Sequence, residues 1–190
     1  SDGTTRAALE ALAAAEPLLR LGRWEVNQGK GAAVVEALRR ARAEGFTHGL
    51  QVDSDGQHDP EAVGPFLVLG EAHPEAVIAG VPRYEGPVPP ARRYGRWFTH
   101  AWVWLETLSF VIGDSLCGFR LYPLEAAVAL ADRVALPRRM DFDTAIIVRL
   151  HWAGLPILNA PVRVTYPADG VSHFDLLRDN LRLTRMHTRL

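Results

Sequence analysis

Residues 48–57 read HGLQVDSDGQ. The first five residues have the length and apolar character of a short buried strand, and Asp53 and Asp55 follow at its exit. Residues i and i+2 share one face of a strand, so these two carboxylates are expected to converge on one cation. Hard ions such as Mg²⁺ and Mn²⁺ prefer carboxylate oxygens and commonly bind substrate phosphates as well. The stretch therefore predicts a metal site at a strand exit.

Gln57 offers a neutral oxygen to the same site, two residues beyond the second carboxylate. The alternative interpretation is structural: an Asx-rich turn that leads into a helix at Pro60, with Asp59 as its N-cap. The position at a strand exit favours the metal site.

Helix and strand patterns alternate along the rest of the chain. We expect helices at 4–15, 32–44, 60–72, 91–112, 124–132, 142–152 and 174–190, strands at 18–26, 48–52, 76–79, 118–122 and 157–166, and a proline-rich loop at 82–90. This alternation indicates βαβ units and an α/β fold with a mostly parallel sheet and flanking helices. Ligands of such sheets bind beyond the carboxyl ends of the strands.

The composition is that of an ordinary globular chain of 190 residues, which predicts one domain. The formal net charge of −1 argues against a nucleic-acid-binding protein, because such domains are usually basic. A single cysteine, Cys117, excludes an intrachain disulfide and fits a reducing compartment. No apolar run has the roughly 18 residues of a membrane-spanning helix.

The only lysine among the 21 basic residues, Lys30, lies in the glycine turn NQGKG at residues 27–31. The turn precedes a predicted helix, whose free N-terminal N–H groups attract anions. It lacks the spacing of a P-loop. Chance placement of the lysine is the alternative, but the position favours a donor-binding residue.

A long aromatic helix opens with Arg92 and Arg96, which are spaced i, i+4 and suit phosphate oxygens. Its tryptophans indicate either core packing or a face for a membrane surface. Asp114 follows this helix and is a candidate general base for an acceptor hydroxyl, although it could also cap the turn. His173 follows a second glycine turn and directly precedes the last predicted helix. It is either a phosphate contact or a surface residue.

Four motifs in order resemble family 2 glycosyltransferases of the GT-A fold, and most of all the polyprenyl- or dolichyl-phosphate mannose synthase-like branch. The motifs are Asp2-Gly3-Thr4, Asn27-x-Gly29-Lys30-Gly31, Asp53-Ser54-Asp55-Gly56-Gln57-His58-Asp59-Pro60 and Asp114-x-x-Cys117-Gly118-Phe119-Arg120. The resemblance covers essentially the whole chain, and it rests on the order and spacing of motifs that are each degenerate.

The resemblance implies a nucleotide-sugar donor, either a UDP- or a GDP-hexose, and a Mg²⁺ or Mn²⁺ cofactor. It implies these roles: Asp2 and Asp53 near the donor base and ribose, Asp53, Asp55 and Gln57 at the metal, Arg92, Arg96, Arg120 and His173 near the phosphates, and Asp114 near the acceptor. The acceptor is expected to be a polyprenyl phosphate, another lipid-linked molecule or another phosphorylated molecule.

The chain departs from the family pattern in two places. Ser1 stands where the D-D-G-S motif has its first acid, and the preceding strand, helix and second strand are missing, so we expect a single GT-A domain, 1–190, that is truncated at its N-terminus. Ala145 also replaces a glutamate that follows the segment 141–144 in the relatives.

The expected function is an inverting hexosyl transfer by a cytoplasmic enzyme that contacts the membrane only peripherally. A nucleotidyltransferase that makes the nucleotide sugar, and a degenerate nucleotide-sugar-binding module, are the alternatives.

Overall fold

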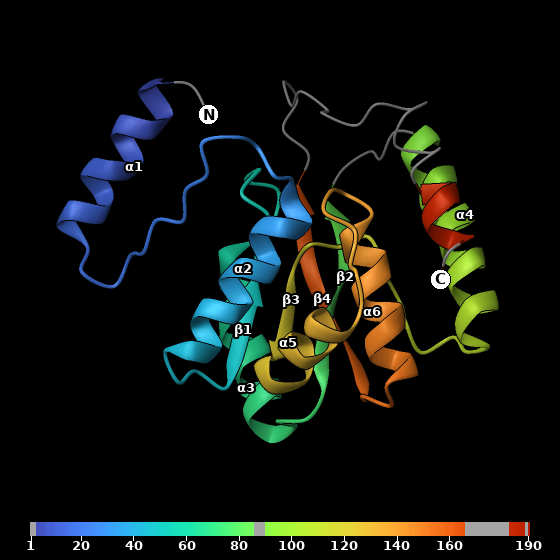
Figure 1. Ribbon diagram of the computed structural model, residues 1–190. Helices are drawn as coiled ribbons and strands as arrows, with labels where there is room; N and C mark the ends of the chain where they lie inside the picture. The colour runs from blue at the N-terminus through green and yellow to red at the C-terminus, as the bar shows by residue number, and fades with distance from the viewer. Residues whose placement is uncertain (1–2, 86–89, 166–182, 189) are drawn as a thin grey trace.

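The computed structural model describes residues 3–85, 90–165, 183–188 and 190 (Figure 1). A four-stranded sheet lies at its centre in the order β1-β3-β2-β4. The strands are β1 (His48–Gln51), β2 (Val77–Glu85), β3 (Arg120–Pro123) and β4 (Ile157–Thr165). β2 pairs with β4 in parallel, whereas β3 is antiparallel to both β1 and β2. Three strands therefore run in one direction and β3 runs against them. The protein has an α/β fold with a mixed sheet.

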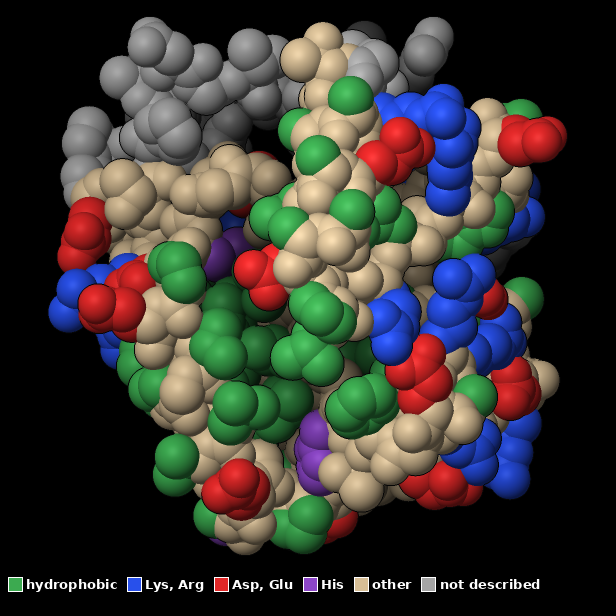
Figure 2. All heavy atoms as spheres, turned by 90° about the vertical axis from the view of Figure 1, so that its left-hand side faces the viewer, with side chains coloured by type: hydrophobic (Ala, Val, Ile, Leu, Met, Phe, Trp, Pro, Cys, Tyr) green, Lys and Arg blue, Asp and Glu red, His purple; other side chains and the backbone are tan. Residues whose placement is uncertain are grey.

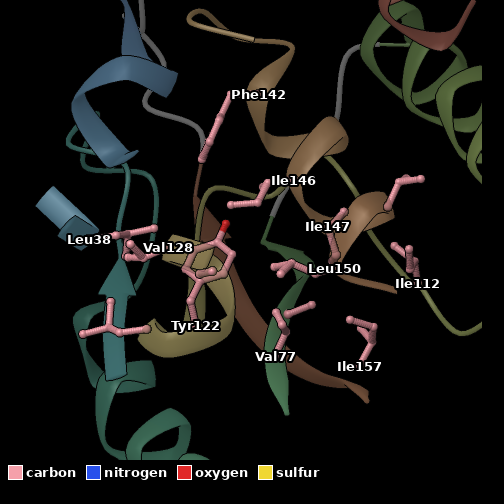
Figure 3. Close-up of a cluster of buried hydrophobic side chains, with 14 of the residues drawn as sticks. Leu38, Val77, Ile112, Tyr122, Val128, Phe142, Ile146, Ile147, Leu150 and Ile157 are labelled. Atoms are coloured by element: carbon pink, nitrogen blue, oxygen red, sulfur yellow. The ribbon is translucent and has the colours of Figure 1, made fainter. Parts of the chain in front are cut away.

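Helices cover both faces of this sheet. The helices are α1 (Gly3–Ala15), which stands away from the sheet in Figure 1, α2 (Lys30–Ala43), α3 (Val63–Ala72), α4 (Pro90–Thr107), α5 (Leu124–Arg133) and α6 (Phe142–Trp152), with a 3-10 turn at Pro60–Ala62 before α3. α2, α5 and α6 lie on one face, and Tyr122 of β3 is buried among their side chains (Figure 3). On the other face, Phe66 of α3 packs edge-on against Phe119, with ring centroids 4.7 Å apart. The two clusters make the sheet a buried layer.

The predicted strand at 18–26 is wrong. The chain between α1 and α2 contains no strand, and Leu18 is 95% exposed. A strand needs a partner for its backbone groups, and in Figure 1 this segment, like α1, stands away from the sheet. Hydrophobic side chains are correspondingly visible over the middle of the molecule when it is viewed from the side on which α1 lies (Figure 2).

Two further boundaries differ from the prediction. The expected loop at 82–90 begins with strand, because β2 continues to Glu85 along β4, in a register that pairs Pro82 with Val162. β3 pairs with β2 only at Ile78 and Ala79, so Pro82 lies where β2 no longer has β3 as a neighbour and a missing N–H is tolerated. α4 ends at Thr107 rather than 112, since Leu108 has a positive φ of 48° that no α-helix accommodates.

Candidate active site at the strand exits

Asp53 follows β1 and lies directly against Gly118, which precedes β3. The antiparallel register pairs Gln51 with Arg120, so the exit of β1 meets the start of β3. A Cβ added to Gly118 would lie 2.1 Å from Oδ2 of Asp53 and 2.3 Å from its Cγ. Only glycine leaves room for the carboxylate here, which gives the Cys-Gly-Phe-Arg motif a physical reason.

Lys30 joins this carboxylate to a second one. Its Nζ lies 2.7 Å from Oδ1 and 2.8 Å from Oδ2 of Asp53, and it donates to Oδ2 of Asp143 at 2.7 Å. Burial alone would lower the pKa of Lys30, but the charges of Asp143 and Asp53 together outweigh it and raise the pKa. The ammonium therefore stays protonated between two carboxylates.

Asp143 is held in the protein interior by polar side chains of the sheet. It lies in the first turn of α6, and Nε2 of Gln51 donates to its Oδ1 at 2.8 Å. The hydroxyl of Tyr122 in turn donates to Oε1 of Gln51 at 3.2 Å. Asp143 was not among the site residues expected from the sequence. The feature that could have pointed to it is its place, as a carboxylate, at the start of a predicted helix. Ala145, two residues later, is fully buried.

Arg120 does not occupy the phosphate-contacting position expected of it. Its side chain is fully buried in β3, between β1 and β2, and donates to the backbone oxygen of Asp143. Burial on a central strand explains the difference, because a guanidinium in this position reaches the backbone of α6 rather than solvent. Arg120 thus supports the start of α6.

The glycine turn before α2 is covered by the segment 137–141. Gly29 has a φ of 92°, and a Cβ at Gly31 would lie 2.3 Å from the carbonyl oxygen of Pro137. The N–H of Ala32 donates to the carbonyl oxygen of Arg138 at 3.2 Å. These glycines allow the close approach of a neighbouring backbone. The sequence had led us to expect free N–H groups at the start of α2 that could hold an anion, but the N–H of Ala32 is already used by this backbone.

Arg96 and Asp114 form the second polar cluster. The Arg96 guanidinium donates to Oδ2 of Asp114 and lies over the Tyr84 ring, 5.8 Å from its centroid. Oδ1 of Asp114 accepts from the backbone N–H groups of Leu116 and Cys117 at 2.8 and 2.7 Å.

Asp114 is almost fully buried, and Nε2 of His100 lies 3.5 Å from its Oδ2. Burial alone would raise the pKa of Asp114, but His100 and the charge of Arg96 outweigh it and lower the pKa to about 2. Asp114 therefore caps its turn, which was one of the two interpretations of the sequence, and it also pairs with Arg96.

Asp55 and Gln57 lie beyond Asp53 in an exposed turn. Oδ1 of Asp55 accepts from the backbone N–H of Gln57 at 3.1 Å, and Asp59 caps the following 3-10 turn. The pKa of His58 is lowered, mainly by burial. The charges of Asp53 and Asp55 oppose this change, and those of Lys30 and Arg96 add to it. The turn therefore combines the two interpretations, an Asx turn and a pair of acidic side chains.

The oxygen ligands at this turn suit a divalent cation whose coordination is completed by the phosphates of its substrate. Within the described ranges, no three His, Cys, Asp or Glu side chains are grouped closely enough to enclose an ion. Mg²⁺ and related ions are often bound by only one or two carboxylates together with substrate phosphates. Asp53 and Asp55 fit such a partial site.

Three of the expected site residues fall outside what the structure describes. Asp2 and His173 lie in undescribed segments, and Arg92 belongs to α4 by its backbone, with its side chain not described. Their roles remain predictions.

The aromatic residues of α4 divide between packing and exposure. The Trp102 ring stacks on His187 with centroids 5.9 Å apart, and Trp104 packs against Phe110 at 5.2 Å. Trp97 and Phe98 are exposed instead. No helix in the described part of the chain combines the length and the apolar character needed to cross a bilayer.

Solved structures of glucosyl-3-phosphoglycerate synthase from Mycobacterium tuberculosis have a similar fold. The complex with UDP matches with a TM-score of 0.61 and 18% sequence identity, over 100% of this chain and 65% of that one. The complex with phosphoglyceric acid gives 0.60 and 17%, over 100% and 65%. The complex with Mn²⁺, UDP and glucosyl-3-phosphoglycerate gives 0.56 and 16%, over 99% and 62%. The present chain thus spans less than two thirds of the length of these proteins.

The sequence itself matches one protein family. No curated protein matches it significantly. The family model described as glycosyl transferase family 2 matches residues 1–127, which include the Lys30 turn, both aspartates at the exit of β1, the Arg96–Asp114 pair and the whole of β3. Together with the GT-A type of fold, this match shows that the chain belongs to glycosyl transferase family 2.

Proposed function

We propose that this protein transfers a hexosyl group from a nucleotide sugar to a phosphorylated acceptor, with inversion and with Mg²⁺ or Mn²⁺. The observation that carries the proposal is the meeting of Lys30 and Asp53 at the exit of β1, next to the exposed carboxylate of Asp55, in a family 2 glycosyltransferase fold. The exits of same-direction strands are where α/β sheets bind nucleotides.

The donor is expected at this edge of the sheet. Asp53 and Asp55, with Gln57, would hold the divalent ion, which when bound supplies positive charge to the departing diphosphate. Asp2 would lie near the base and ribose, and Arg92, Arg96 and His173 near the phosphates. The planar guanidinium of Arg96 suits this task because it can bind two phosphate oxygens at once.

Asp114 is proposed to orient Arg96 and the acceptor rather than to remove a proton. A carboxylate with a pKa of about 2 is a weak base at neutral pH. Its oxygens already accept from Arg96 and two backbone N–H groups, which fixes the direction of the guanidinium. An acceptor that brings its own negative charge is the substrate that such a site suits best.

A phosphorylated acceptor is also consistent with the solved relatives. Structures of glucosyl-3-phosphoglycerate synthase hold UDP-glucose with glycerol 3-phosphate or phosphoglyceric acid. A polyprenyl phosphate presents the same phosphate chemistry on a lipid. Trp97 and Phe98, both exposed on α4, are the residues that would meet a membrane surface if the lipid-linked acceptor applies.

The test is sugar transfer by the full-length protein from radiolabelled UDP-glucose or GDP-mannose, with Mn²⁺. One set of reactions contains 3-phosphoglycerate and another contains polyprenyl phosphate in detergent. We expect labelled product in one set, none with EDTA, and at least a hundredfold less with Asp55→Ala. Asp132→Ala, which removes a surface carboxylate that pairs with Arg39, is the matched control and should retain wild-type activity. Wild-type turnover by Asp55→Ala would contradict the metal assignment.

A further inference from the structure

The ammonium of Lys30 lies where two carboxylates converge. Its Nζ is within 2.8 Å of both oxygens of Asp53 and 2.7 Å from Oδ2 of Asp143. A cation between carboxylates satisfies their charge whether it is an ammonium or a metal ion. Lys30 is also the only lysine of the 190 residues, so no other lysine side chain can take this position.

The two carboxylates hold Lys30 in different ways. Asp143 is 3% exposed at its side chain, and its second oxygen is fixed by Gln51. Asp53 is 25% exposed and stands at the strand exit, where, within the described part of the chain, Lys30 is the charged side chain paired with it. The contact with Asp143 is therefore the fixed one, and the contact with Asp53 is the one that a solvent-borne cation can replace.

We propose that Lys30 is a built-in counter-ion that competes with the divalent cation for Asp53, and that Asp143 is the positioning residue that keeps the ammonium in the site when Asp53 turns to the metal. This inference rests on the metal use proposed above. It adds a regulation of that site: in the metal-free protein one ammonium is shared by the two carboxylates, and the N–H groups of Lys30 that Asp53 releases become available to the donor only when metal arrives.

The proposal predicts opposite effects for two substitutions. Lys30→Gln removes the competing charge but retains an amide that can donate to Asp143, so Mn²⁺ should bind more tightly, by about tenfold or more, the change typical of removing one adjacent charge. Asp143→Asn leaves the ammonium with Asp53 as its sole carboxylate, so Mn²⁺ should bind several-fold more weakly. A general loss of structure would weaken binding in both variants.

The experiment measures free Mn²⁺ by electron paramagnetic resonance while the metal alone is titrated into each protein. Arg39→Gln is the matched control for Lys30→Gln, because it removes one positive charge from the same helix at an exposed position. Asp132→Asn is the control for Asp143→Asn. Circular dichroism and thermal melting verify that each variant is folded.

The double variant Lys30→Gln/Asp143→Asn replaces the buried ion pair by two neutral amides and tests the idea even if a single variant fails to fold. It should bind Mn²⁺ more tightly than wild type. Unchanged or weaker Mn²⁺ binding by Lys30→Gln and by the double variant would overturn the competition. If sugar transfer is nevertheless metal-dependent, that result leaves the proposed function intact. If instead the expected Mn²⁺ shifts occur without any sugar transfer, the proposed function is refuted and the competition between Lys30 and the metal stands.

Discussion

Gly118 is the position where the smallest change should disturb the candidate site most. In Gly118→Ala, the new Cβ would lie 2.1 Å from Oδ2, 2.3 Å from Cγ and 2.4 Å from Oδ1 of Asp53. Carbon–oxygen contacts are normally no shorter than roughly 3.3 Å, so the carboxylate must move by about 1 Å. This shift breaks at least one of its contacts with Lys30, which are 2.7 and 2.8 Å long.

The cost follows from this overlap. Overpacking a fitted site destabilises a protein by typically 1–3 kcal/mol, and a displacement of about 1 Å at a catalytic group can reduce activity about a hundredfold. We therefore expect Gly118→Ala to lose about 2 kcal/mol of unfolding free energy. It should also bind Mn²⁺ about tenfold more weakly, because the displacement of Asp53 as a metal ligand outweighs the weaker competition from Lys30.

Urea denaturation and Mn²⁺ titration measure these two effects. Gly64→Ala is the control: it adds the same methyl group within α3, where nothing lies within 4 Å of the new Cβ, and it should stabilise the helix slightly. If Gly118→Ala matches wild type in both stability and Mn²⁺ affinity, the close packing of Asp53 on Gly118 is not what positions the carboxylate.

Three further outcomes are expected. The pKa of Asp114 is lowered to about 2 from its ordinary 3.8, so its stabilisation is complete above about pH 4 and disappears as the pH falls through 2. Wild type should lose about 2 kcal/mol more unfolding free energy than Asp114→Asn over that interval, as acid-dependent urea melts would show. Phe119→Ala removes a fully buried ring that packs on Phe66 and should cost about 3–5 kcal/mol in denaturant; a loss below 1 kcal/mol would contradict its role in the core. In liposome flotation with a lipid-linked acceptor, Trp97→Ala should reduce binding more than Trp104→Ala, because Trp97 is exposed and Trp104 is partly buried.

The sequence predicted those parts of the fold that depend on local pattern. The helix expected at 142–152 is α6 with the same bounds, and the strand expected at 48–52 is β1 to within one residue. Apolar periodicity and a terminal glycine are local signals, so they transfer directly to structure. Alternation at 18–26 was equally local, but a strand also needs a partner, which the pattern does not supply.

The candidate site was predictable only where a local motif marks its residues. Asp53 was expected at a strand exit and Lys30 in a glycine turn before a helix, but their direct contact joins residues 23 positions apart and could not be deduced from spacing. The contact from Lys30 to Asp143 joins residues 113 positions apart, on two different helices. Arg120 was expected at a phosphate because of its motif, and the insertion of β3 between β1 and β2 places it in the interior instead.

The most direct test of a metal-assisted donor site at the exit of β1 is the binding of UDP and GDP to the full-length protein, measured by calorimetry with and without Mn²⁺. We expect one of the two diphosphates to bind in the presence of Mn²⁺, EDTA to abolish the binding, and Asp55→Asn to weaken it at least tenfold while Asp132→Asn does not. Binding that is equally strong without metal, or equally strong in Asp55→Asn, would contradict a metal-assisted nucleotide-sugar site at the exit of β1.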